Sequence, residues 1–206
     1  MSNSNYPRAW QRFTAQSRPT DGVVPETLGG KFGPLAKWSA RFRLAKSFKG
    51  LDLGNAYAGS ETPQLYAAIT RIFLVYSAFE TYCNIVGLKP YEEAQVKPLQ
   101  EALSQQATLQ TIREIDPQYA IAKFLAEHLT NKKLKQTMGA FMDRQTTEGQ
   151  AVNVSCFARG VRHVFAHGIL TANAPGLSPQ RFDQVSRIVS VFLLDCMDQD
   201  FDERVP

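Results

Sequence analysis

Apolar residues recur at steps of three and four along two long stretches of the chain, the spacing that lines one face of an α-helix. The first stretch follows Thr62 and Pro63, a capping residue and a proline suited to the first helical position, and it ends at Gly87. The second follows Ser178 and Pro179 in the same way. Each apolar face must be buried against other elements, and no strand-like run competes. The sequence therefore predicts an all-α fold, a helical bundle of four to six helices.

Weaker periodicity indicates shorter helices between these two stretches. We expect a polar helix over residues 91–106, another over 117–130, and a further helical piece around Leu134. The penultimate helix is expected over about residues 150–171, because the run Asn173-Ala-Pro-Gly that follows is a helix breaker.

The N-terminal part of the chain has a different composition. We interpret residues 1–60 as a basic arm that contains Pro and Gly, and residues 61–206 as the helical bundle. Residues 1–33 show no sustained apolar period, so we expect a partly irregular structure there. Residues 35–48 fit both a helix and a strand, and we favour the helix.

Charge is distributed unevenly along the chain. Residues 1–50 hold nine Lys and Arg against two acidic residues, whereas the rest of the chain holds fourteen basic and seventeen acidic residues. A basic arm on a near-neutral body is a common way to bind a polyanion, and equally a common solvated tail. The last helix ends in an acidic run over residues 195–203, which opposes the helix dipole. That end is expected to fray or to find a basic partner such as the arm.

Composition and cysteine usage narrow the class of protein. The 206 residues are 44% hydrophobic and 20% charged, which allows one core and excludes wholesale disorder. The longest apolar stretch contains Arg71 and Glu80, and the N-terminus lacks the apolar run of a secretory signal, so we expect no membrane span and a cytoplasmic protein. Cys83, Cys156 and Cys196 suit reduced core thiols better than disulfides or a metal site. No metal and no cofactor are expected.

The penultimate helix carries three side chains that can do chemistry. At about 100° per residue, its core face gathers Val154, Phe157, Ala158, Val161 and Phe165. His163 and His167 lie almost opposite that face and are stacked neighbours four residues apart, while Arg162 occupies the flank. Such histidines are either simply exposed, or they line a cleft or a subunit interface.

Residues 161–168, Val-Arg-His-Val-Phe-Ala-His-Gly, resemble the signature of the HEPN family: an arginine, a polar residue, three variable positions and a histidine. The resemblance implies a bundle of four or five helices that dimerises and brings two arginine–histidine motifs together. It also implies a metal-independent endoribonuclease or, as in some members, a nucleotide- or RNA-binding module. The expected partners are therefore RNA and a second copy of the chain.

Metal-independent RNA cleavage needs a proton acceptor, a proton donor and a fixed positive charge at the phosphate. We assign acid/base work to His167 and phosphate binding to Arg162, while His163 occupies the family's intervening polar position and orients the site. Glu80 resembles the acidic residue that many HEPN members carry on an earlier helix. It either orients Arg162 or His167, or makes an ordinary salt bridge or faces solvent.

Further basic residues are candidates for contact with RNA phosphates, although a solvated surface explains them as well. They are Lys132, Lys133, Lys135, Arg41 and Arg43. By contrast, His128 lies on an apolar face and is expected to be a hydrogen-bonded core histidine.

HEPN toxins with nucleotidyltransferase antitoxins commonly carry a tyrosine two residues after the histidine, where this chain has Ile169. That departure argues against a toxin of this type and leaves any antitoxin or regulatory partner unspecified.

Two other functions compete with a ribonuclease. The chain could be a catalytically silent helical module that holds RNA or a protein through the basic arm and Trp10, Trp38 and Phe42. A metal site on His163 and His167 is the weaker alternative, because no Glu or Cys stands nearby in sequence to complete it.

Overall fold

The computed structural model describes residues 5–17, 24–57, 60–143, 152–168 and 176–206. Within these ranges it contains nine α-helices, two short 3-10 helices, η1 (Glu26–Leu28) and η2 (Asn55–Tyr57), and no β-strand. The all-α class predicted from the sequence is confirmed, and the expected count of four to six helices was too low.

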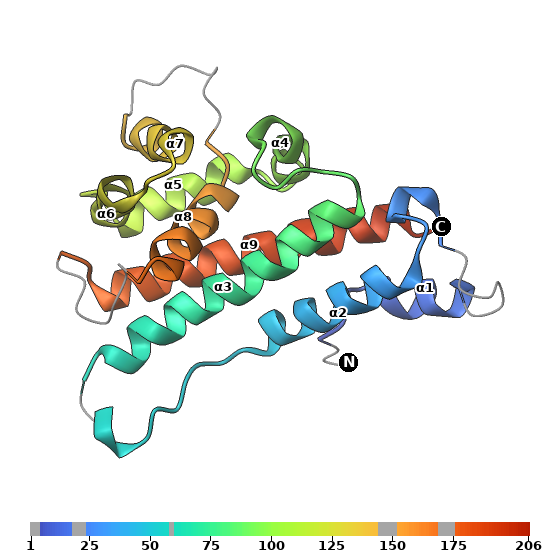
Figure 1. Cartoon of the computed structure of the whole chain (residues 1–206), viewed down its shortest axis with the longest axis horizontal. Helices are drawn as coiled ribbons and strands as arrows, with labels where there is room; N and C mark the ends of the chain where they lie inside the picture. The colour runs from blue at the N-terminus through green and yellow to red at the C-terminus, as the bar shows by residue number, and fades with distance from the viewer. Residues whose placement is uncertain (1–4, 18–23, 58–59, 144–151, 169–175) are drawn as a thin grey trace.

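Two long helices run side by side through the middle of the molecule, α3 (Thr62–Ile85) and α9 (Pro179–Arg204) (Figure 1). On one side, α2 (Phe32–Ser47) lies along α3, and α1 (Trp10–Ser17) lies near the C-terminal end of α9. On the other side, α8 (Ser155–Ala166) packs against α3. Four shorter helices complete that side: α4 (Glu93–Glu101), α5 (Gln105–Ile115), α6 (Ala120–His128) and α7 (Lys132–Met142).

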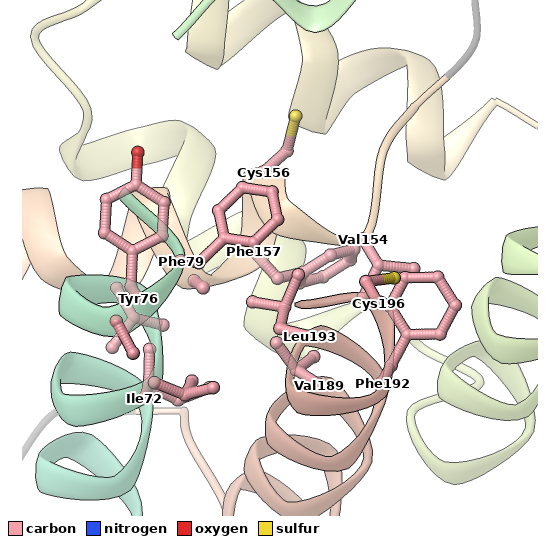
Figure 2. Close-up of a cluster of buried hydrophobic side chains, with 14 of the residues drawn as sticks. Ile72, Tyr76, Phe79, Val154, Cys156, Phe157, Val189, Phe192, Leu193 and Cys196 are labelled. Carbon is pink, nitrogen blue, oxygen red and sulfur yellow. The ribbon is translucent and has the colours of Figure 1, made fainter. Parts of the chain in front are cut away.

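The core forms where the apolar faces of α3, α8 and α9 meet (Figure 2). Phe79 of α3, Phe157 of α8 and Leu193 of α9 are all buried there. Full burial of such a side chain stabilises the fold by about 1.5–3 kcal/mol. The two long apolar stripes read from the sequence are therefore the main reason that α3 and α9 pair.

All three cysteines are buried and free, which confirms the prediction of reduced core thiols. Burial raises the pKa of Cys83 and of Cys156 to about 12, so both thiols stay protonated at neutral pH. Among the described helices, none combines the length and the apolar character needed to cross a membrane.

Several helix ends differ from the sequence prediction. Ser178 caps α9 as expected, with its side chain accepting a hydrogen bond from the backbone N–H of Arg181. Thr62 does not cap α3, because it already lies within the helix and Glu61 precedes it. The expected helix over 91–106 is two helices, since Ser104 adopts the left-handed region at φ 54° between them.

The penultimate helix is shorter than expected. Residues 152–154 are not helical, and Gly168, at φ 72°, follows the last turn. Ile169 and the breaker that starts at Asn173 lie outside the described residues, as do residues 150 and 151.

The N-terminal arm is more ordered than its composition suggested. Residues 10–17 form α1, a helix that the sequence analysis did not predict, and the ambiguous segment is the helix α2 as favoured. Phe13 of α1 and Trp38 of α2 belong to the same buried core as α3 and α9. Residues 1–4 and 18–23 lie outside the described residues.

Basic residues of the arm hold the acidic end of α9. Arg8 pairs with Asp198, and Arg12 pairs with Asp202, each with nitrogen and oxygen 3.1 Å apart. The expected basic partner of this unfavourable helix end is thus the arm, which confirms that prediction.

Candidate functional site

Helix α8 is buried on two sides and leaves a narrow polar face. Val161 and Val164 are buried, and a Cβ built on Gly160 would lie 3.3 Å from the Leu125 side chain of α6. Phe165, which we expected in the core, is 36% exposed. Helix α8 packs against α6 and α7 as well as against α3. Its buried face therefore includes Val164 and leaves Phe165 partly exposed.

Arg162 is held against α3 by two side chains. Its Nη2 lies 3.5 Å from Oε2 of Glu80, and its Cζ lies 5.6 Å above the ring centroid of Tyr76. Burial, and then the charge of Glu80, raises the pKa of Tyr76, so this ring stays neutral. The Arg162 side chain is still 43% exposed, which leaves guanidinium donors available to an incoming anion.

The two histidines form a pair at the end of α8. Their ring centroids lie 4.5 Å apart in an edge-on arrangement. Nε2 of His163 shares a hydrogen bond of 2.8 Å with Oγ1 of Thr130, which lies between α6 and α7. Burial, followed by the charges of His167 and Arg159, lowers the pKa of His163. Nε2 of His163 is therefore engaged by Thr130, and the ring favours the neutral form. His167, by contrast, is exposed at the helix end.

Arginine and histidines point to different neighbours. Arg162 faces Glu80 and Tyr76 on α3, and His163 faces Thr130. Among the described contacts, no hydrogen bond or ion pair joins Arg162 to His167. One chain thus offers a half-exposed guanidinium and an exposed imidazole near the end of one helix.

Other predicted site residues are spread over the molecule. Lys132, Lys133 and Lys135 are exposed on α7. This helix begins two residues after Thr130, which is hydrogen-bonded to His163. Arg41 donates to Oγ1 of Thr81, while Arg43 donates to the Tyr6 hydroxyl at 2.7 Å. Both arginines are exposed on α2, which lies on the other side of α3 from α8 (Figure 1).

Trp38 and Phe42 are fully buried, so they are not accessible for the contacts that the alternative of a silent binding module assigned to them. Trp10 is half-buried and packs against Tyr6 and Phe13. His128 is hydrogen-bonded as predicted, with Nδ1 2.8 Å from the Phe124 carbonyl, but it is half-buried and does not lie in the core.

Sequence reasoning missed three neighbours of the site. Tyr76 precedes Glu80 by four residues and Arg159 precedes His163 by four, so helical spacing alone could have placed both on the relevant faces. Thr130 gave no such signal, because its contact with His163 depends on how α6 and α8 pack. Within the described residues, no cluster of three metal-ligating side chains includes the two histidines.

No family model, no curated protein and no solved structure matches this chain. The resemblance to the HEPN family therefore rests on the motif at residues 161–168.

Proposed function

We propose that the surface at the end of α8 binds and cleaves RNA without a metal ion, in a homodimer of the HEPN type. The observation that carries this proposal is that one helix end presents both an accessible guanidinium, Arg162, and an exposed imidazole, His167. One side chain is fixed by Glu80 and Tyr76 yet half-exposed, and the other is exposed one turn further along the same helix.

The chemistry divides between these groups. The 2′-hydroxyl attacks phosphorus and gives up its proton to an imidazole, and the bond to the 5′-oxygen breaks as a second imidazole donates a proton to that oxygen. The products are a 2′,3′-cyclic phosphate and a 5′-hydroxyl. Arg162 neutralises the charge that builds up on the phosphate oxygens.

A second copy supplies what one chain lacks. Nε2 of His163 is taken by Thr130, so a single chain presents one unoccupied imidazole, His167, where the reaction needs two. Two copies facing each other would provide a histidine on each side of the scissile phosphate. This is the physical reason to expect activity from the dimer.

Incubation of purified protein with mixed RNA in the presence of a chelator tests the proposal. We expect cleavage to 2′,3′-cyclic phosphate ends, and His167→Ala should lower the rate by about 10²–10⁴-fold while RNA binding remains. Arg162→Ala should weaken both. The matched controls are His128→Gln, on the third histidine, and Arg181→Ala, on an exposed arginine at the start of α9.

A cleavage rate that His167→Ala leaves unchanged would overturn the proposal. One observation favours a silent RNA-binding module instead: Glu80 already pairs with Arg162, while the α7 lysines are exposed. Binding without cleavage in the wild type, lost on replacing Lys132, Lys133 and Lys135, would establish that alternative.

A further inference from the structure

The outer face of α9 has an apolar strip in its middle. Val191 is 57% exposed, the most of any large hydrophobic side chain among the described residues. It lines a groove of about 390 Å³ between α5 and α9, together with Ile188 and Phe192. Arg187 lies at one end of this strip and Asp195 at the other. The proposed ribonuclease site uses none of these residues.

The strip is symmetric about Val191 in sequence. Arg187 and Asp195 each stand four residues from Val191, and the half-buried Ile188 and Leu194 each stand three residues from it. On an α-helix these offsets place all four within about 60° of Val191 around the axis. If a second α9 runs in the opposite direction with its Val191 at the same level, its Asp195 lies level with Arg187 of the first helix. Its Leu194 likewise lies level with Ile188.

The charges at the two ends have capacity for a partner. Asp195 is exposed and forms no ion pair within the part of the chain that the structure describes. Burial and the charge of Asp198 raise its pKa, and Arg8 and Lys46 oppose them only in part. Arg187 donates from Nε to Asp183 at 2.9 Å, and its side chain is 59% exposed, so other guanidinium donors remain.

We infer that this strip binds a second copy of the chain, with the two α9 helices antiparallel across a two-fold axis at Val191. The two copies of Val191 then meet at the axis, and each Arg187 lies level with Asp195 of the other copy. Charges of one sign would face each other in a parallel arrangement, which is therefore disfavoured. This surface differs from the α8 surface that the proposed ribonuclease dimer uses.

A cysteine on a two-fold axis lies next to its own copy, which gives a direct test. Val191→Cys should form a disulfide-linked dimer under oxidised glutathione, and the wild type, whose cysteines are all buried, should not. The matched control is Gln184→Cys, exposed on the same face but about 10 Å along the axis from Val191, so that its two copies lie about 20 Å apart. Equal cross-linking of the two variants would overturn the inference.

A charge-swap cycle tests the antiparallel register by sedimentation. Arg187→Asp and Asp195→Arg should each raise the dissociation constant of this contact by about tenfold, and the double variant should restore it to within about threefold. Within one chain the two positions are about 12 Å apart, beyond the range of unscreened interaction at ordinary salt, so recovery must arise between copies. No recovery in the double variant would overturn the register. Neither experiment involves RNA, so failure here leaves the proposed function untouched.

Discussion

Two arginine–carboxylate pairs link α3 to its neighbours, and they differ in length and in exposure to solvent. Arg71 of α3 pairs with Asp183 of α9 at 2.5 Å, with side chains 8% and 10% exposed. Glu80 of α3 pairs with Arg162 of α8 at 3.5 Å, with side chains 34% and 43% exposed. The first pair is closed off from solvent, and the second stands open to it.

Burial explains why the Arg71–Asp183 pair has more hydrogen-bond partners than the Glu80–Arg162 pair. Nη1 of Arg71 donates to Asp183 and also to Ser186, and the second oxygen of Asp183 accepts from Arg187. Such a network is needed because an unpaired buried charge is strongly destabilising. The open pair is worth little to folding, since water competes for both partners. Under the proposed function, Arg162 would therefore exchange part of its contact with Glu80 for a phosphate at small cost.

The largest expected effect comes from breaking the buried pair. Asp183→Asn leaves Arg71 buried without a counter-charge and should lower the free energy of unfolding by about 3–5 kcal/mol, measured by urea denaturation. The control is Asp202→Asn, which removes the half-exposed partner of Arg12 and should cost less than about 1 kcal/mol. The double variant Arg71→Met/Asp183→Leu should lose less than Asp183→Asn alone. Equal losses for Asp183→Asn and Asp202→Asn would contradict the comparison.

The Arg8–Asp198 pair is intermediate between the buried and the open pair, because only its carboxylate is buried. Asp198 is buried and accepts bonds from the backbone N–H and Nε of Arg8, whose side chain is largely exposed. Asp198→Asn should lower the free energy of unfolding by about 1.5–3 kcal/mol. The charged acceptor is lost from a buried position, but Arg8 is exposed and water can solvate it. Hydrogen exchange should accelerate at the amides of α1 and stay slow in the middle of α3. Unchanged protection of α1 would show that the arm is held by its aromatic contacts alone.

At the open pair the effect on stability should be small. Glu80→Gln should change the free energy of unfolding by less than about 1 kcal/mol, yet lower RNA cleavage by roughly tenfold through looser placement of Arg162. Glu80→Asp should recover part of the rate, and Glu127→Gln, at an exposed position of α6, is the control. A rate that follows stability across these variants would assign Glu80 a structural role only.

The smallest effect is a pH dependence beside the open pair. The pKa of His163 is lowered from its ordinary value of 6.5 by burial and by nearby positive charges, so the unfolded chain binds this proton more readily than the folded one. Its contribution to stability is complete above 6.5 and is lost as the pH falls through the folded pKa. Denaturation of wild type and His163→Gln over this window measures the difference, and identical pH profiles would contradict it. Titration of the ring protons by NMR gives the folded pKa directly.

Strong helices were predictable because their signal is local. Pro63 and Pro179 mark the beginnings of α3 and α9, and long apolar stripes fix which face turns inward. Short helices were misplaced where a single backbone conformation decides an end. Ser104 and Tyr119 adopt positive φ without being glycine, and buried Asp116 accepts from the first N–H groups of α6, which no periodicity reveals.

Helix α1 was missed for a related reason. Phe13 and Ser17 are its only buried residues, too few to produce a pattern. The ring of Phe13 packs edge-on against Phe201 at the far end of the chain, with centroids 5.5 Å apart. The helix is therefore stabilised by a contact that the local sequence cannot encode.

The candidate site also has one part that the sequence predicts and one part that depends on tertiary structure. The sequence alone determined that Arg162, His163 and His167 share the end of one helix, because that follows from the rise and turn of the backbone. Tertiary structure decided what each meets. Thr130 reaches His163 across 33 residues, and Arg71 finds Asp183 across 112. Contacts at such separations depend on how whole helices pack, and helix packing is set by the shape and burial of many side chains together.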